Sequence, residues 1–298
     1  MLAEIEKQKV KFKVTLLGTG CPNLTMARFG NSTLVEIEDE KFLFDTGRGA
    51  TLRLHQLNIM PGMIDKVFFT HLHSDHLTGF PDVWLSGVIP TLGKRAKPME
   101  IWGPVGTKKM AEHLEKAFTP DIEGRIAHGT IHPEGAQLIA YEIEEGVVYN
   151  RNGIQIIAFI VDHGTIKPCY GYRINYAGHS LVISGDTCYN ENLIHHSKDA
   201  DVIIHEVAAA KIEGKDSKTL QHIMEIHTTP EQAGKVFSQI KPKLAVYSHI
   251  VLLGGLSEEE ADLIGRTKTT YSGPVIVGED LMTIEIGDEL KVENPLES

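Results

Sequence analysis

The sequence predicts an α/β fold of the αββα sandwich type, in which two mixed β-sheets pack face to face and helices cover their outer surfaces. Strand-like and helix-like segments alternate in both halves of the chain, and short polar turns join several strands as hairpins. The chain has 298 residues, 42% of them hydrophobic, which is enough for a large core. Because no Ser/Gly/Pro-rich linker divides the halves, we expect one domain over residues 1–298.

The first half supplies strands and helices of ordinary length. Alternating apolar residues predict strands, and apolar residues at helical spacing predict helices. We expect strands at residues 10–18, 32–38, 41–45, 65–70 and 99–102, and helices at 50–57, from 81 onward and at 107–117. Residues 119–124 are predicted to form a loop, and the irregular segment 77–155 supplies either a flap over the site or a plain surface excursion.

The second half continues in the same style. We expect strands at residues 154–161, 171–174, 180–184, 202–205, 244–248, 275–277 and 281–286. A helix is expected at 230–240, because Pro230 suits its first turn and Thr228 and Thr229 are candidate caps.

Composition narrows the classes of partner and compartment. The formal net charge of −11 is unfavourable for broad contact with a nucleic-acid backbone. Three scattered cysteines are too few for a disulfide framework. The N-terminal residues 1–13 contain no apolar signal region, and no stretch approaches the roughly 20 apolar residues needed to span a bilayer. We therefore expect a cytoplasmic protein without a membrane partner.

A histidine-rich run, His71-Leu72-His73-Ser74-Asp75-His76, follows the predicted strand at 65–70. Residues two apart on an extended segment point the same way, so His71 and His73 can share one metal ion. The following turn directs Asp75 and His76 toward a second position. Imidazole and carboxylate groups are natural zinc ligands, and a chance surface cluster explains this run poorly.

Three later residues, His163, Asp186 and His249, each follow a predicted strand. Open α/β folds collect their functional groups at the carboxyl ends of strands, so these side chains are expected beside the histidine run. The combined set suffices for two metal ions with Asp186 between them. We expect two zinc ions, and manganese or iron would be accepted by the same ligand types.

The pattern HxHxDH, a later His, an Asp within Gly-Asp-Thr and a final His resembles the metallo-β-lactamase superfamily, over about residues 13–282. The resemblance implies a ligand set for each of two metals and a homodimer, the common state of relatives. The first metal would be held by His71, His73 and His163, the second by Asp75, His76 and His249, and Asp186 would bridge the two.

Four further runs resemble the ribonuclease Z branch, at residues 17–20, 44–47, 204–207 and 227–229. By that resemblance, His227 is the general acid and Glu206 is the carboxylate that orients it. In the mechanism we expect, Asp75 orients the attacking water and can accept its proton. A protonated imidazole can supply a proton to a leaving oxygen, and an adjacent carboxylate keeps it protonated. The plainer alternatives are a His227 bonded to a helix cap and a Glu206 that is an ordinary surface charge.

Two departures argue against tRNA 3′ processing. That branch usually carries a protruding arm between the positions of His163 and Asp186, which here are only 23 positions apart. The usual lysine-arginine-asparagine order of its phosphate loop is also missing, although Arg28 could bind an anionic substrate group. Lys94, Arg95 and Lys97 are the candidates for a local basic surface if RNA binds after all.

The runs at residues 146–149, 161–164, 167–173 and 191–194 resemble an arylsulfatase-like group more closely. We therefore expect a binuclear hydrolase of small-molecule esters, arylsulfatase- or phosphodiesterase-like, and do not expect tRNA as a partner. The alternatives are a ribonuclease Z-type tRNA 3′ endonuclease, a β-lactamase or lactonase, and a metal-binding protein without catalysis.

Overall fold

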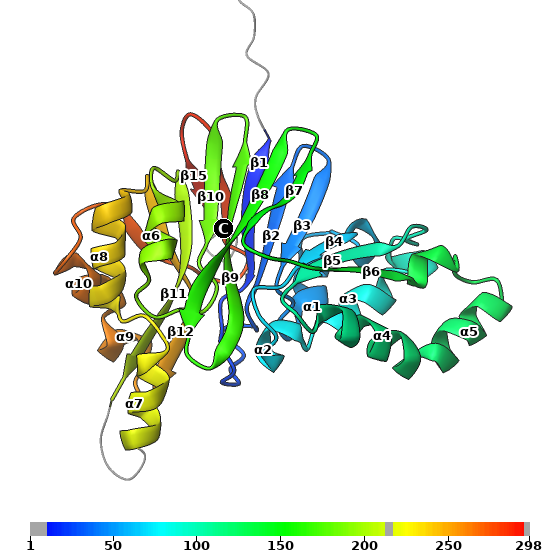
Figure 1. Ribbon diagram of the computed structural model, residues 1–298, viewed down its shortest axis with the longest axis horizontal. Coiled ribbons are helices and arrows are strands. Elements are labelled where there is room, and N and C mark those ends of the chain that lie inside the picture. Colours follow the sequence, from blue (N-terminus) through cyan, green and yellow to red (C-terminus); the bar gives the residue numbers. More distant parts are fainter. Residues whose placement is uncertain (1–10, 212–216, 295–298) are drawn as a thin grey trace, which may run out of the picture.

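The computed structural model describes residues 11–211 and 217–294, and within them the predicted αββα sandwich is confirmed. The N-terminal residues used to judge the absence of a signal, apart from the last three, lie outside the described residues, as does residue 10, the predicted start of the first strand. Two mixed sheets face each other, and helices cover both outer surfaces (Figure 1).

The first sheet has eight strands in the order β15-β14-β1-β2-β3-β4-β5-β6. Their bounds are β1 Phe12–Gly18, β2 Ser32–Ile37, β3 Glu40–Phe44, β4 Lys66–Phe68, β5 Met99–Gly103, β6 Leu138–Glu142, β14 Thr283–Glu285 and β15 Lys291–Glu293. The second sheet has seven strands in the order β13-β12-β11-β10-β9-β8-β7. Their bounds are β7 Gly146–Arg151, β8 Ile154–His163, β9 Ile166–Tyr176, β10 His179–Ile183, β11 Val202–Ala210, β12 Leu244–Leu253 and β13 Val275–Val277.

Helices cover the outer face of each sheet. On the first sheet lie α1 Ala50–Gln56, α3 Phe80–Ser86, α4 Thr107–Ala117 and α5 Thr119–Ala127, and on the second lie α6 Glu191–Ser197, α8 Pro230–Ile240 and α10 Leu263–Lys268 (Figure 1). Shorter or more peripheral helices are α2 Ser74–Leu77, α7 Ser217–Glu225 and α9 Glu258–Ala261, with single 3₁₀ turns at Pro61–Met63, Pro90–Leu92 and Glu134–Ala136. No helix in the described part of the chain is long and apolar enough to cross a membrane.

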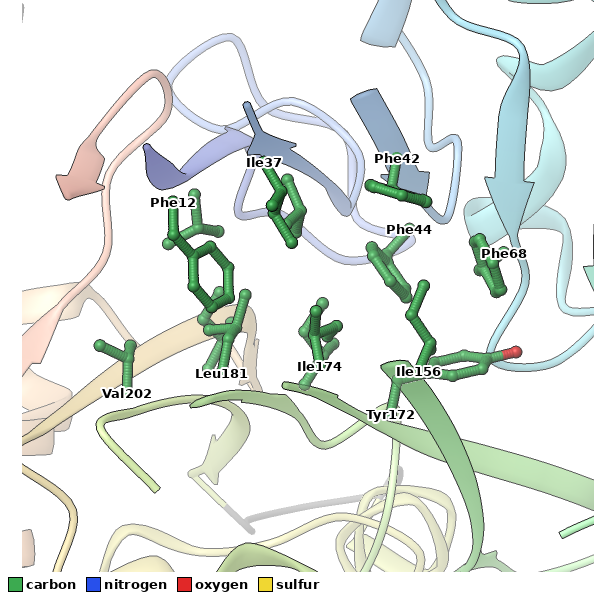
Figure 2. Close-up of a cluster of buried hydrophobic side chains, with 14 of the residues drawn as sticks. Phe12, Ile37, Phe42, Phe44, Phe68, Ile156, Tyr172, Ile174, Leu181 and Val202 are labelled. Carbon is green, nitrogen blue, oxygen red and sulfur yellow. The ribbon is translucent and has the colours of Figure 1, made fainter. Parts of the chain in front are cut away.

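The main core fills the space between the sheets. Figure 2 shows Phe12, Phe42 and Phe44 of the first sheet facing side chains such as Tyr172 and Leu181 of the second. Phe68 of the first sheet is fully buried, and its ring meets that of Tyr172 of the second sheet edge-on, with centroids 5.7 Å apart. Edge-to-face aromatic contacts add to the free energy gained from burial, so this cluster holds the two sheets in a fixed relation.

Several sequence expectations need correction. Residues 119–124 belong to helix α5, because Pro120 occupies its first turn and Arg125 pairs with Asp121 one turn earlier at 2.9 Å. The segment 77–155 forms no flap but builds α3, α4, α5 and the strands β5, β6 and β7, of which the sequence had predicted neither β6 nor β7. Both are edge strands with many exposed residues, so their apolar pattern is weak.

The topology places many loops at one end of the sandwich. Strands β3 to β6 are mutually parallel, as are β10 to β13, so their carboxyl ends share an edge in each sheet. Helix α2 and the turn between β8 and β9 lie together at the lower end of the sheets in Figure 1. The segments predicted to carry metal ligands therefore meet at this end.

Replacement of Phe68 by Ala tests the importance of the inter-sheet cluster. Removing a fully buried ring leaves a cavity and is expected to cost about 3–5 kcal/mol of the free energy of unfolding. Denaturant unfolding followed by circular dichroism measures the change. Val292→Ala, on edge strand β15 and 44% exposed, is the control and should change that free energy by less than about 0.5 kcal/mol. Similar losses for both variants would contradict this account.

Candidate metal centre and active site

All seven predicted metal ligands converge at the carboxyl edge of the sheets. His71 and His73 follow β4, while Asp75 and His76 occupy the first turns of α2. The other three come from the second sheet: His163 ends β8, Asp186 follows β10 and His249 lies within β12. His73 is the most accessible of the set, and the other six are buried.

Three histidines form the first group of potential ligands. His71 Nε2 lies 3.0 Å from His73 Nδ1, and His163 Nε2 lies 3.4 Å from the same His73 atom. The three ring nitrogens all lie within 4.8 Å of one another. Three imidazoles with their nitrogens turned together are a typical site for zinc.

A second group of three residues, Asp75, His76 and His249, lies beside the first. Asp75 Oδ2 is 3.4 Å from His76 Nε2 and 3.2 Å from His249 Nε2. Two ligands bound tetrahedrally to one zinc at about 2.1 Å lie roughly 3.4 Å apart, so this spacing suits a shared ion.

Asp186 joins the two groups through a single oxygen. Its Oδ2 lies 3.4 Å from the Nε2 atoms of both His76 and His249. The same oxygen lies 3.9 Å from His71 Nε2 and 3.8 Å from His163 Nε2. A carboxylate oxygen with imidazoles of both groups around it is positioned to bridge two metal ions.

His249 reaches the centre because of a β-bulge. In the β11–β12 pairing, Glu206 faces Ser248 and Val207 faces Ile250, which leaves His249 as the extra residue. Its φ of 44° is left-handed, a region that costs energy for a residue other than glycine. Bulges redirect side chains next to active sites, and this one directs His249 toward Asp75 and Asp186.

In three of these histidines, the ring nitrogen that faces away from the centre is held by a hydrogen bond. Thr70 Oγ1 donates to Asp45 Oδ2 at 2.8 Å, so the hydroxyl can accept from His71 Nδ1 at 3.0 Å. Asp45 Oδ2 accepts from His76 Nδ1 at 2.7 Å, and the carbonyl oxygen of Ile226 accepts from His163 Nδ1 at 3.1 Å. Each bond leaves an Nε2 lone pair directed at the centre, as metal-binding histidines require.

The local sequence pattern did not indicate the role of Asp45. This residue is 1% exposed and supports both His71, through Thr70, and His76 directly. The run Phe44-Asp45-Thr46-Gly47 indicated only a resemblance to a family. The available signal for Asp45 was its position at the end of a buried strand.

The electrostatics of the centre suit a cation. Burial and the neighbouring His76 hold the pKa of His71 well below its ordinary value. Burial also opposes protonation of His76, but the carboxylates of Asp186 and Asp45 outweigh it and raise the pKa of His76. His76 Nε2 and Asp186 Oδ1 are buried without a hydrogen-bond partner among the described residues. A metal ion would satisfy these atoms, so the residues present fit the group.

His227 and Glu206 form a pair beside the metal ligands. His227 Nδ1 lies 3.1 Å from Glu206 Oε1, which also accepts from the backbone N–H groups of Thr187 and Thr228 at 3.1 Å each. Burial opposes protonation of His227, but the carboxylate of Glu206 outweighs it and raises the pKa of His227 to about 9. A nitrogen of His227 lies within 4.8 Å of ligand atoms of His163 and Asp186, so a protonated ring stands next to the centre.

Arg28 has a different role from the one expected. Its Nε and Nη2 donate to the carboxylate of Glu258 at 2.7 and 2.9 Å, and its Nη1 donates to Thr19 Oγ1 and the Gly278 carbonyl. Four of its five donors are therefore bonded within the protein, which makes Arg28 a structural link.

Of the three residues suggested as a local basic surface, only Lys94 and Lys97 are exposed. Arg95 is 3% exposed and donates to three backbone carbonyls, and Lys97 pairs with Asp65. Arg95 is therefore not available to RNA, while the side chain of Lys97 stays 70% exposed beside its ion pair.

Comparison with known proteins independently supports the fold and the family of this chain. A family model described as β-lactamase superfamily domain matches residues 40–250. A ribonuclease Z from Mycolicibacterium gilvum is 32% identical over 279 residues, 92% of this chain and 96% of the relative. The metallo-β-lactamase fold protein YhfI from Bacillus subtilis superimposes with a TM-score of 0.73 at 19% identity, covering 93% of this chain and 100% of YhfI. The short form of human tRNase Z superimposes with a TM-score of 0.66 at 23% identity, covering 92% and 99%.

The expectation that tRNA is not a partner is wrong in the light of these relatives. It rested on the absent arm and the acidic net charge. The alignment with the ribonuclease Z relative spans nearly the whole of both chains, so a chain of this length and without room for an arm can carry that name. The names of these relatives lend no support to the small-molecule ester expected as partner instead.

Replacement of Asp186 by Ala tests the bridging position. Both ligand groups lose the oxygen they share, so we expect the variant to retain only a small fraction of the metal bound by the unaltered protein, and to lose activity by orders of magnitude. Metal analysis after gel filtration measures the first quantity. Asp82→Ala removes an exposed aspartate on α3 and should leave metal content unchanged. A fully metallated Asp186→Ala protein would show that Asp186 is structural.

Proposed function

Because the chain belongs to the metallo-β-lactamase superfamily, on its ribonuclease Z branch, we propose that it is a phosphodiesterase of the ribonuclease Z type that cleaves RNA 3′ extensions. The chain is a metal-dependent hydrolase of ester bonds, and the proposal concerns its substrate. The observation that carries it is the buried His227–Glu206 pair beside the ligand groups, in a chain alignable with a ribonuclease Z over almost its full length.

The proposed cofactor is a pair of zinc ions. The first would be held by His71, His73 and His163, the second by Asp75, His76 and His249, and Asp186 would bridge them. This division is supported by the two ligand groups and by the oxygen that lies near four imidazoles. Bound zinc supplies hydroxide near neutral pH and stabilises the charge that develops on the phosphate.

Two side chains of the site, Asp75 and His227, have different roles in proton transfer. Burial opposes ionisation of Asp75, but hydrogen bonds from His249 and His76 hold the pKa of Asp75 below its usual range. Asp75 is therefore a carboxylate that can orient the attacking water and accept its proton. Glu206 favours the protonated form of His227, against the opposing effect of burial, and raises its pKa to about 9. His227 can donate that proton to the oxygen that leaves the phosphate.

The environment of Glu206 supports its assignment as the orienting group. It is 2% exposed, and Oε1 accepts from His227 as well as from two backbone amides. Three donors on one oxygen fix the direction of the carboxylate group. The carboxylate then holds His227 through Nδ1 and leaves Nε2 as the atom that can reach the substrate.

A parallel assay of four substrates tests the proposal. We expect cleavage of a tRNA precursor with a 3′ extension to exceed hydrolysis of a nitrophenyl sulfate or phosphodiester, and a cephalosporin to remain intact. Product length on a sequencing gel identifies the cleavage site. Chelator-treated protein should be inactive until zinc is restored, with close to two equivalents bound. Efficient ester hydrolysis without RNA cleavage would contradict the proposal in favour of a small-ester hydrolase.

Replacement of His227 by Ala tests the general acid. A poor leaving group needs a proton in the transition state, whereas a nitrophenolate leaves readily without one. The variant should lose about 10²–10⁴-fold in kcat on RNA and much less on a nitrophenyl phosphodiester. Glu206→Gln should show the same pattern, more weakly, and the double variant should be far from additive.

His222 on α7, whose side chain is 70% exposed, provides the matched control for that experiment. His222→Ala should leave both rates unchanged. Equal losses of His227→Ala on good and poor leaving groups would make His227 a positioning residue, and a loss of metal would place it among the ligands.

A further inference from the structure

A buried carboxylate outside the ligand set, Asp280, organises the loop between β1 and β2. Asp280 lies between β13 and β14 and is 2% exposed. Its Oδ1 accepts from the backbone N–H and hydroxyl of Thr19 at 2.9 and 2.8 Å. Its Oδ2 accepts from the backbone N–H of Phe29 and from Arg53 Nη2, both at 2.7 Å. One side chain thereby ties together both ends of the loop.

One end of this loop contacts the strand that carries His249. The carbonyl oxygen of Thr19 accepts from the backbone N–H of Ile250 at 2.9 Å, directly after His249. His249 is the extra residue of the bulge and has a left-handed backbone, so it needs a neighbour that holds it there. The bond from Ile250 to Thr19 is such a contact, and Asp280 fixes Thr19.

The other end of the loop contacts the support of His76. Asn31 Nδ2 lies 3.4 Å from Asp45 Oδ2 and 3.5 Å from His76 Nδ1, and Asn31 Oδ1 accepts from Ser248 Oγ at 3.4 Å. The dark-blue segment between β1 and β2 lies at the same lower end of the sheets as α2 (Figure 1). Both histidines of the second ligand group therefore touch, directly or through one neighbour, the loop that Asp280 closes.

The first ligand group is supported differently. His71 is held by Thr70, and His163 is held by the carbonyl of Ile226. Neither bond involves the loop between β1 and β2 directly. That loop reaches His71 only through a chain of three residues, Asn31, Asp45 and Thr70. A change confined to that loop should consequently affect the two groups unequally.

We propose that Asp280 is a positioning residue that sets the metal affinity of the Asp75–His76–His249 group without contacting metal or substrate. The inference rests on the two-metal site of the proposed function. Both carboxylate oxygens are required, because each accepts two donors and Arg53 brings a positive charge to Oδ2. Asparagine has one oxygen and an NH₂ that would face donors, so Asp280→Asn cannot satisfy the same four groups.

The test measures zinc affinity at each group separately, by titrating metal-free full-length protein against a competing chelator. His163→Ala disables the first group and isolates the second, while His249→Ala disables the second and isolates the first. Addition of Asp280→Asn should weaken zinc binding in the His163→Ala background roughly 10–100-fold, the usual effect of losing support behind a ligand. In the His249→Ala background the affinity should stay within about twofold.

Asp201 offers a matched control. It is also a buried carboxylate, 6% exposed, which accepts from the backbone N–H of Ser180 at 2.7 Å and pairs with Lys243. It precedes β11 at the end of the strand away from the metal ligands. Asp201→Asn should lower the thermal unfolding temperature without changing zinc affinity in either background. The proposal would be overturned if Asp280→Asn left zinc affinity unchanged, as Asp201→Asn should, or if it weakened zinc binding at both groups equally.

A milder variant covers the case in which Asp280→Asn does not fold. Thr19→Val removes one of the four donors with little change of shape, and should weaken the second group selectively but by a smaller factor. Equal or absent effects on the two groups would again overturn the proposal. Zinc affinity is measured without substrate, so failure of RNA cleavage would refute the proposed function while leaving this result intact.

Discussion

The constraint on which this site depends is the convergence of four imidazole nitrogens on one carboxylate oxygen, Asp186 Oδ2, at 3.4 to 3.9 Å. Lone pairs turned toward one another in a buried space repel, and a single carboxylate cannot accept from all of them as neutral rings in good geometry. Cations placed between the rings and the oxygen remove this conflict. The arrangement is therefore stable as a metal site and costly without one, which explains why the surrounding fold must hold it firmly.

The sandwich holds the site from both sheets at once. His71 and His73 depend on β4, which lies between β3 and β5, whereas His163 and His249 belong to long strands of the second sheet. The aromatic cluster around Phe68 and Tyr172 fixes the distance between these sheets. A packed interior transmits a shift of one sheet directly to the ligands at its edge. Core packing and ligand geometry are thus parts of the same structural requirement.

Local patterns made most of the site predictable, and long-range contacts account for what was missed. The run from His71 to His76 carries its chemistry within six positions, and strands before His163, Asp186 and His249 indicate their common edge. Asp45 and Asp280 act through hydrogen bonds to residues far along the chain. A local pattern can mark Asp45 at the end of a strand, but it cannot show which residues these carboxylates contact. Arg28 shows the converse case, since an arginine near the site proves to be bonded to Glu258, Thr19 and Gly278. The edge strands β6 and β7 escaped because exposed strands lack a strong apolar alternation.

The expectation that excluded tRNA rested on two sequence features, net charge and the absence of an arm, that are weak indicators of substrate. Net charge is a sum over the whole surface, whereas recognition depends on the groups that surround the reacting bond. An inserted arm is likewise an addition to a fold, and its absence leaves the chemistry of the centre intact. In the proposed function, by contrast, the His227–Glu206 pair would serve a leaving group that needs a proton, which is a property of the bond that is cleaved. Residues that meet the demands of the reaction are therefore stronger indicators of substrate class than charge or insertions.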